Sequence, residues 1–394
     1  MADDTIYYLQ NTTQAYHWGH PKAMEKLFSI ANPEQLPQAE MWMGAHDKAP
    51  SFIQRPQAMN AFISENPEQV LGAEINARFC GKLPFLLKLL SAEKPLSIQA
   101  HPNKQAAERG FARENALGIP LTASQRNYRD DNHKPELIYA LTPFKAMNGF
   151  RSIDEIVRLF TFIDNSVLGV WLSDLQQAND SDGLKVFYQS LMALQDVEKQ
   201  CLLDDALVAA NQSDELALQE LLTLYQYYPG DIGVLSPLLL HVVTLAPGEA
   251  MFLKSGTLHA YLQGTGLEIM ASSDNVLRGG LTNKHIDIQA LIETIDFEPT
   301  DATELRVHAV VTQAQTSFPV PVSDFSFSVI NAFDEAQSYT CRSAEILFCL
   351  QGSVTVRTSA GQCLVLNLGQ SCLLTAQTRE YSIAGCGRVA RASA

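Results

Sequence analysis

The sequence lacks long hydrophobic runs, an excess of basic residues and closely spaced cysteines, and each absence excludes a class of protein. The apolar run at residues 238–245 is too short to span a bilayer and is interrupted by His241. The chain begins Met-Ala-Asp-Asp-Thr, with acidic residues where a signal peptide needs basic ones. We therefore expect neither a membrane-spanning segment nor a secretion signal.

Basic residues are the second shortage. The chain has 28 lysines and arginines against 43 aspartates and glutamates, which gives a formal net charge of -15. A charge of this sign repels nucleic acids and anionic lipids, so we expect no nucleic-acid partner and no membrane contact. A small phosphorylated substrate is compatible with it, provided that a local cluster of cations holds the phosphate.

Cysteines are present in an odd number and without a Cys-x-x-Cys pair. Five of the seven lie from Cys341 onward, where they alternate with apolar residues as small core side chains do. This pattern predicts reduced thiols in a cytoplasmic protein.

Apolar residues are plentiful enough for large folded cores. A chain of 394 residues with 46% hydrophobic side chains can fill two or three domains. Residues 52–98 alternate apolar segments with turn residues, which predicts a β-rich region with strands at 83–90 and 95–101. In residues 151–240 the apolar positions have helical spacing instead, most clearly at 152–162, 183–194 and 213–227.

The β pattern returns after residue 237 and dominates the last part of the chain. Short strands are predicted at 325–330, 345–349, 354–357, 362–366 and 371–375. This pattern is typical of a sandwich or barrel. We therefore expect a mainly β protein with an inserted α-helical domain, divided into residues 1–150, 151–240, 241–300 and 301–394.

One spacing occurs twice in this β-rich part. Gly-x5-Lys-x-Gly-x2-His ends at His259, and Gly-x5-Asn-x-Gly-x2-Cys ends at Cys372. Glycines permit the positive φ values that reverse a chain, and the fixed spacing presents the last residue on the next strand. The repetition predicts two related β-barrels, one with histidine and the other with cysteine at the same position.

Residues around His259 have the composition of a reactive site. His259 is predicted at the end of a strand, and two carboxylates (Glu268 and Asp274), a guanidinium (Arg278) and an amine (Lys284) follow within a short stretch. This composition suits a metal site beside an anion site. Further ligand types occur upstream, at residues 99–101 and 133–136.

Six segments together resemble the type I mannose-6-phosphate isomerases of the cupin superfamily. The segments are Tyr16–Gly19, Glu40–His46, Leu96–Pro102, His133–Glu136, His259–Tyr261 and Asn275–Thr282. They follow the order of the family and span residues 16 to about 290. The resemblance implies cupin-type barrels, or jelly rolls: a catalytic one built from 1–150 and 241–300, and a metal-free one at 301–394.

The metal ligands are predicted from strand geometry and from the resemblance. Alternate residues of a strand share a face, so Gln99 and His101 should point the same way, as should Lys134 and Glu136. A single histidine among strands is more often a hydrogen-bonded residue than a ligand, but one amide, two imidazoles and one carboxylate together suit Zn²⁺. The resemblance implies one Zn²⁺ per chain, held by Gln99, His101, Glu136 and His259.

The resemblance also implies the reaction, which is the interconversion of D-mannose 6-phosphate and D-fructose 6-phosphate through an enediolate. This proton transfer needs a base and an electrophile. Arg278 stays protonated and suits an anionic oxygen, and the resemblance implies that it is catalytic. Lys134 is the second catalytic candidate, with a solvated lysine as the alternative. Glu268 and Asp274 are alternative bases, and the proton shuttle is left unassigned between them.

Four residues are expected to contact the substrate, which is a sugar phosphate. The protein is expected to be a monomer. Lys88 lies in an apolar strand, so its charged end must leave the core or meet a partner. It is our preferred secondary contact for the phosphate. Ser97 flanks the ligand pair and can donate a hydrogen bond, and the carboxylates Glu268 and Asp274 complete the set.

Departures from the family pattern and rival functions frame these expectations. Asn283 stands where the family has proline, which loosens the loop that carries Lys284. No glycine-rich nucleotide-binding signature precedes the β region, which argues against the bifunctional guanylyltransferase type. The rivals are an isomerase of another aldose, such as free mannose, and a regulatory cupin that binds sugar phosphate without turnover.

Overall fold

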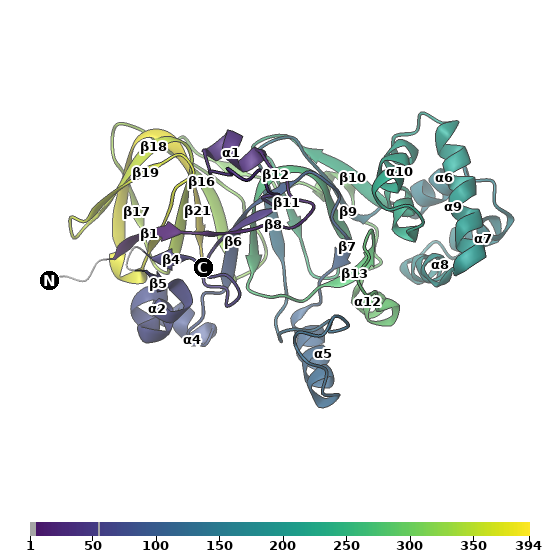
Figure 1. The fold of residues 1–394 in the computed structure, drawn as a ribbon, viewed down its shortest axis with the longest axis horizontal. Coiled ribbons are helices and arrows are strands. Elements are labelled where there is room, and N and C mark those ends of the chain that lie inside the picture. The colour runs from purple at the N-terminus through teal and green to yellow at the C-terminus, as the bar shows by residue number, and fades with distance from the viewer. Residues whose placement is uncertain (1–4, 54–55) are drawn as a thin grey trace.

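The structure is a computed structural model that describes residues 5–53 and 56–394. Residues 1–4, part of the acidic start that argued against a signal peptide, lie outside the described residues. Figure 1 shows two β-rich bodies and a group of helices along the longest axis, with the helices at one end and the C-terminal strands at the other. In the described ranges no helix combines the length and the apolar character that a membrane crossing needs.

The first barrel is an antiparallel sheet of ten strands. They are β2 (Thr12–Gln14), β3 (Glu40–Met43), β6 (Phe85–Ala92), β7 (Ile98–Ala100), β8 (Glu136–Ala140), β9 (Phe144–Phe150), β10 (Leu240–Leu245), β11 (Ala250–Leu253), β12 (His259–Ala271) and β13 (Leu277–Gly280). The start of β12 pairs with β7 and β9, and its end pairs with β6 and β8. β12 therefore belongs to two walls and closes them around a common interior.

Alternation along the strands of the first barrel separates its interior from its outside. On β6, Leu87 and Leu89 join the apolar cluster shared with the second barrel, whereas Lys88 and Leu90 face the interior. On β9, Ala146 faces the interior and Met147 packs against the helices. Lys88 is thus buried on the inner face, as the period of two requires.

The second barrel is a sheet of eleven strands. They are β1 (Ile6–Gln10), β4 (Phe52–Ile53), β5 (Gln57–Ala58), β14 (Val310–Val311), β15 (Gln315–Ser317), β16 (Ser326–Ala332), β17 (Gln337–Thr340), β18 (Glu345–Thr358), β19 (Cys363–Asn367), β20 (Ser371–Leu374) and β21 (Glu380–Ser393). β1 pairs with β20 and β4, so three strands from the predicted 1–150 segment lie in the sheet of the C-terminal strands. The predicted strands at 345–349 and 354–357 are one long strand, β18.

The helical unit comprises the helices between β9 and β10. They are α6 (Ile153–Phe160), α7 (Ser166–Ala178), α8 (Ser181–Ala193), α9 (Asp196–Asn211), α10 (Leu216–Tyr227), η1 (Ile232–Leu235) and α11 (Ser236–Leu239). The side chains of Ser152, Asn165 and Asp180 accept backbone N–H hydrogen bonds at the starts of α6, α7 and α8, as N-caps do. The three helices predicted at 152–162, 183–194 and 213–227 are present as α6, α8 and α10.

Residues 59–78 correct the prediction of a β-rich region at 52–98. This stretch forms α2 (Met59–Glu65), α3 (Pro67–Leu71) and α4 (Ala73–Arg78). The buried residues Met59 and Ile63 lie four positions apart on α2, as on one face of a helix, and Pro67 begins α3. The remaining helices are α1 (Ala23–Phe28), α5 (Lys104–Ala116), α12 (Ile288–Thr294), η2 (Ala302–Glu304) and η3 (Ala376–Thr378).

None of the seven cysteines, all of which lie in the described ranges, forms a disulfide in the structure. Cys341, Cys349 and Cys372 are buried, as predicted for small core residues. Cys363 and Cys386 are exposed, and for these two the prediction of a core role is wrong. On β19 the exposed positions alternate with buried ones, and Cys363 falls on the outer face.

Candidate metal centre and substrate site

A row of polar side chains crosses one wall of the first barrel. Asn148 on β9 is paired with His259 on β12, His259 with Gln99 on β7, and Gln99 with Arg278 on β13. Directly opposed residues of antiparallel strands project from the same face of a sheet. The row therefore points into the barrel, on the same side as Ala146 and away from the helical unit.

Two further residues meet His259 inside the barrel. His101 follows β7, and Glu136 is the first residue of β8. His101 Nε2 lies 3.3 Å from Glu136 Oε1, and His259 Nε2 lies 3.5 Å from Glu136 Oε2. All three side chains are at most 1% exposed.

The outer nitrogens of both imidazoles are held by backbone carbonyls. His101 Nδ1 donates to the carbonyl of Asn275 at 2.7 Å, and His259 Nδ1 donates to the carbonyl of Thr257 at 2.9 Å. Because a carbonyl can only accept, the proton of each neutral ring is on Nδ1, and Nε2 presents its lone pair to the cluster. Burial, followed by the charge of Lys134, lowers the pKa of His101 to about 4 and favours this neutral form.

The residues fit a divalent metal ion. The two Nε2 atoms and both Glu136 oxygens are buried, and none of them has a hydrogen-bond partner among the described residues. Ligands about 2.0–2.1 Å from a tetrahedral zinc ion are separated by about 3.4 Å, which is close to the separations found here. One ligand atom from each of His101, Glu136 and His259 lies within 4.8 Å of the others. Gln99 is next to His259 in the cross-strand row.

Lys134 adjoins this cluster. Its Nζ lies 2.8 Å from Glu136 Oε1, without the alignment of a hydrogen bond, and the side chain is buried. Burial opposes the charge of Glu136, but Lys134 and His101 outweigh it and hold the pKa of this carboxyl well below its usual range. Glu136 is therefore a carboxylate, the form that binds a metal ion.

Lys88 meets two carboxylates in the interior. Of the two alternatives predicted for its charged end, it therefore meets a partner and does not leave the core. Its Nζ lies 2.8 Å from Glu268 Oε2 and 3.6 Å from Glu40 Oε1, and 5.5 Å from the centre of the Trp42 ring. Burial opposes its charge, yet the two carboxylates raise the pKa of Lys88 above its ordinary value. Burial raises the pKa of Glu268, against the effect of Lys88.

Asp274 differs from Glu268 in exposure and in partners. It is ion-paired with Lys48 and lies 3.4 Å from His46, and its side chain is 29% exposed. Burial opposes its charge, but hydrogen bonds from His46 and Lys48 prevail and lower the pKa of Asp274. Asp274 is therefore a weaker base than Glu268.

Three cations lie close together here: Arg278, which belongs to the row, and Arg129 and Lys284 near it. Burial, followed by Arg129, lowers the pKa of Arg278, and burial followed by Arg278 and Arg129 lowers the pKa of Lys284. In residues 5–53 and 56–394 no carboxylate pairs with any of the three side chains. Ser97 precedes β7 and, by alternation, shares the face of Gln99. The arrangement concentrates positive charge locally in an acidic chain.

Sequence reasoning did not identify several residues of this interior. Arg129 and Asn148 enter through loop geometry and strand register, and neither stands in a recognisable spacing with the ligands. The side chain of Asn148 is buried and has no hydrogen bond within the described part of the chain. The hydroxyl of Tyr261 is also buried there without a partner. Burial, Glu268 and Glu136 raise the pKa of Tyr261.

Comparison with known proteins places these features in a family context. Residues 6–153 match the family model "Phosphomannose isomerase type I, catalytic domain", and residues 314–394 match "Mannose-6-phosphate isomerase, cupin domain". The mannose-6-phosphate isomerase of Salmonella typhimurium is 45% identical, and that of Escherichia coli 43%, each over 97% of this chain and 98% of its own. A zinc-bound crystal structure of mannose 6-phosphate isomerase superimposes with a TM-score of 0.94 at 44% identity, covering 99% of both chains.

Proposed function

The chain belongs to the type I mannose-6-phosphate isomerases, and from that premise we propose that it interconverts D-mannose 6-phosphate and D-fructose 6-phosphate. The observation that carries the proposal is the buried group of His101, Glu136 and His259. Its two Nε2 atoms and two carboxylate oxygens converge without hydrogen-bond partners among the described residues, and three cations without ion-pair partners there lie nearby. This combination suits a metal-assisted reaction on a phosphorylated substrate.

We propose that Gln99, His101, Glu136 and His259 hold one Zn²⁺. Neutral His101 and ionised Glu136 are in the protonation states that a metal ion requires. The Nδ1 hydrogen bond of His259 directs its Nε2 toward the same point. When bound, Zn²⁺ supplies a Lewis acid that polarises or orients an oxygen of the opened sugar. The carbonyls of Asn275 and Thr257 keep both rings turned toward the ion.

The phosphate is placed on Lys284 and Arg129, next to Arg278. These cations repel one another, and an anion relieves that repulsion. Ser97, on the face of Gln99, donates a hydrogen bond to the bound sugar phosphate. Lys88 remains a substrate contact, but its two carboxylate partners assign it to a sugar oxygen in the interior rather than to the phosphate. Asp274 contacts the substrate from the more exposed side.

Proton transfer is assigned to the buried groups next to the metal ligands. Glu268 takes the proton from C2 and returns it to C1, because its raised pKa makes it a better base than Asp274. Arg278 donates hydrogen bonds to the enediolate oxygen, whose negative charge it stabilises. Lys134 exchanges a proton with the neighbouring sugar oxygen as the carbonyl moves from C1 to C2.

We also propose that the enzyme is a cytoplasmic monomer. The seven free cysteines are consistent with a reducing compartment. Light scattering of the purified protein should give a mass near 43.4 kDa. A mass of twice that value would contradict the monomer.

The test of the function is conversion of mannose 6-phosphate by the purified protein before and after dialysis against a chelator. We expect activity to be lost on dialysis and restored by one equivalent of Zn²⁺. The C2 proton should exchange with solvent, and free mannose should be converted far more slowly. A protein that binds zinc and sugar phosphate but exchanges no C2 proton would instead be a binding protein.

A further inference from the structure

Strands β7 and β13 have one face toward the proposed site and the other toward the helical unit. Gln99 and Arg278 are directly opposed on the inner face. The outward residues Ile98, Ala100 and Leu277 pack in the same apolar cluster as the residues of α8 and α10. Figure 1 shows the helical unit next to this side of the barrel. The strands are therefore a thin partition between the chemistry and the helices.

Gly279 makes a close contact across this partition. It follows Arg278 and by alternation faces the helical unit, where a Cβ atom at this position would lie 2.8 Å from the hydroxyl of Tyr188. Tyr188, on α8, is itself buried, and its hydroxyl has no hydrogen-bond partner among the described residues. Since the ring cannot move freely in a packed core, only glycine lets β13 lie this close to α8.

The segment after β13 is tied to the helical unit by Asp231. Its Oδ2 accepts a hydrogen bond from the backbone N–H of Thr282 at 3.1 Å, and its Oδ1 accepts one from Gly233 at 2.7 Å. The backbones of Gly233 and Gly280 are also in contact, because a Cβ atom on Gly280 would lie 2.8 Å from Gly233 Cα. Asp231 thus holds the loop between Arg278 and Lys284.

A third contact holds the start of the neighbouring strand. The hydroxyl of Tyr228, at the end of α10, donates a hydrogen bond to the carbonyl of Pro95 at 2.7 Å. Pro95 lies three residues before β7, the strand that carries Gln99 and leads to His101. The helical unit therefore contacts both strands of the partition near their functional residues.

We infer that the helical unit positions Arg278 and Lys284 for the reaction, with Asp231 as the positioning residue and the Tyr188 and Gly233 surface as the support for β13. This inference rests on the proposed function, because Asp231 acts on the substrate only through the loop that it holds. Asp231 is not a catalytic residue. The helical unit is then a working part of the active site, although none of its side chains need touch the sugar.

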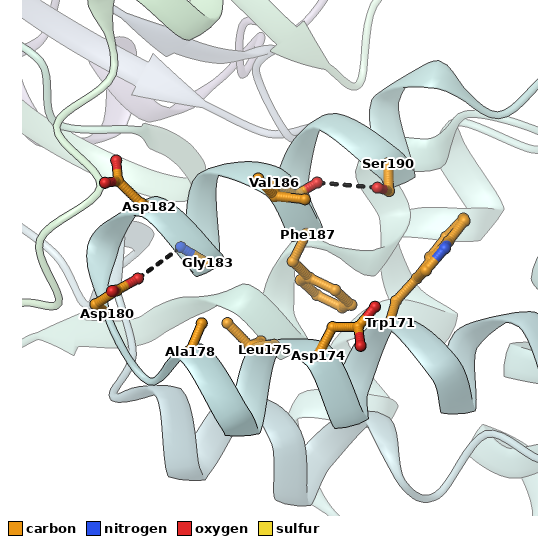
Figure 2. A pocket seen from close by; sticks show the side chains of 10 residues that line it. All are labelled: Trp171, Asp174, Leu175, Ala178, Asp180, Asp182, Gly183, Val186, Phe187 and Ser190. Atoms are coloured by element: carbon orange, nitrogen blue, oxygen red, sulfur yellow. Dashed lines mark hydrogen bonds between the residues drawn. The ribbon is translucent and has the colours of Figure 1, made fainter.

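The first test replaces Asp231. Asp231→Ala should lower kcat/KM for mannose 6-phosphate about 10-fold or more, with bound Zn²⁺ unchanged, and Asp231→Asn should lose less because it keeps one acceptor. Asp174→Ala is the matched control: Figure 2 shows this carboxylate in the groove between α7 and α8, a place formed by the helical unit alone. Equal activities for Asp231→Ala and Asp174→Ala would overturn the inference.

The second test uses the contact at Gly279. Gly279→Ala should reduce kcat about 10-fold or more by moving β13 away from Tyr188. Tyr188→Phe alone should remain near wild type, because the hydroxyl that it removes has no partner. The double variant should recover most of the lost activity. A double variant as impaired as Gly279→Ala would overturn the inference, because the steric contact would then not be the cause.

Hydrogen exchange separates this inference from the proposed function. In Asp231→Ala the amides of residues 278–284 should exchange at least 10-fold faster than in wild type, whereas those of β20 should not change. This result supports the positioning role of Asp231 even if the wild-type protein turns over no mannose 6-phosphate. Such a lack of turnover would refute only the proposed function. Unchanged amide exchange at residues 278–284 would overturn the positioning role of Asp231 even in an active enzyme.

Discussion

The two barrels present a side chain to the interior in the same way and surround it differently. His259 and Cys372 each follow a turn that contains a positive-φ glycine, Gly256 (φ 85°) and Gly369 (φ 77°). Both side chains are fully buried. His259 meets Glu136 and His101, whereas Cys372 packs in an apolar cluster with residues such as Leu347. Reactivity therefore depends on the neighbours that strand pairing supplies, and not on the turn.

Both barrels also bury a glutamate beside a cation. In the second barrel Arg391 donates to both oxygens of Glu345, at 2.6 and 2.8 Å, and Tyr381 donates a further hydrogen bond at 2.7 Å. In the first barrel Glu268 pairs with Lys88, and its pKa is raised by burial. The satisfied carboxylate is a structural device, and the less satisfied one remains available for chemistry.

The largest expected contrast between the barrels comes from substituting the matched residues His259 and Cys372 one at a time. His259→Ala should lower turnover at least about 1,000-fold, because it removes a ligand of the proposed Zn²⁺. Cys372→Ala should leave turnover within about threefold and cost about 1 kcal/mol of stability through a small cavity. Steady-state kinetics, zinc analysis and denaturant titration measure these effects. Equal losses of turnover in the two variants would remove the distinction.

A pair of arginines gives the next largest difference. Arg278→Ala should lower kcat about 100- to 1,000-fold and leave zinc stoichiometric, because it removes a donor to the enediolate. Arg391→Ala should leave kcat per folded molecule unchanged but destabilise the protein by about 3 kcal/mol, since Glu345 loses its buried partner. Unchanged turnover in Arg278→Ala would exclude Arg278 from the mechanism.

The two buried glutamates test the assignment of the base. Glu268→Gln should reduce kcat about 100-fold through loss of the proton acceptor. Glu345→Gln should act on stability instead, by about 2 kcal/mol, with kcat preserved. Exchange of the C2 proton with solvent distinguishes loss of the base from loss of binding. If Asp274→Asn abolished this exchange and Glu268→Gln did not, Asp274 would be the base.

The smallest expected effect is a loss of folding stability in mild acid, which should arise in the first barrel and not in the strands of the second. Burial lowers the pKa of His241 on β10, whose Nε2 donates to the carbonyl of Thr300, whereas the strands of the second barrel contain no histidine. The unfolded chain therefore binds this proton more readily than the folded one. The stabilisation is complete above the unfolded pKa of about 6.5 and declines as pH falls below it.

Urea titrations of the metal-free protein at pH 7.5 and 5.5 measure this effect. His241→Asn should lose less stability between the two pH values than wild type, while the metal ligands contribute equally to both proteins. An identical pH dependence for the two proteins would show that His241 is not the sensitive group.

Sequence patterns predicted features that depend on neighbouring residues. Alternation predicted that Gln99 and His101 share a face, and apolar spacing located α6, α8 and α10. The family segments then related residues far apart in the chain. The charge of Lys88 in an apolar strand left two alternatives, an end that leaves the core or one that meets a partner, and the structure shows the second.

Features that depend on long-range pairing were not predictable from the same patterns. Asn148 enters the site only through the register of β9 with β12, and Arg129 only through a loop that folds against Asn275. Short helices at residues 59–78 were mistaken for part of a β region because four- to seven-residue apolar patterns suit both. The exposure of Cys363 depends on which face of β19 is covered.

The pairing of β1 with β20 has a consequence for the way the chain is made. The hydrogen bonds of Thr5 and Ile6 include ones to residues more than 350 positions later, namely Gln362 and Thr378. At about 5–20 residues per second, roughly 20 to 70 seconds separate the synthesis of β1 from that of its partner. During this time the edge of β1 that later pairs with β20 has no partner strand. Closure of the second barrel is therefore a late event in biogenesis.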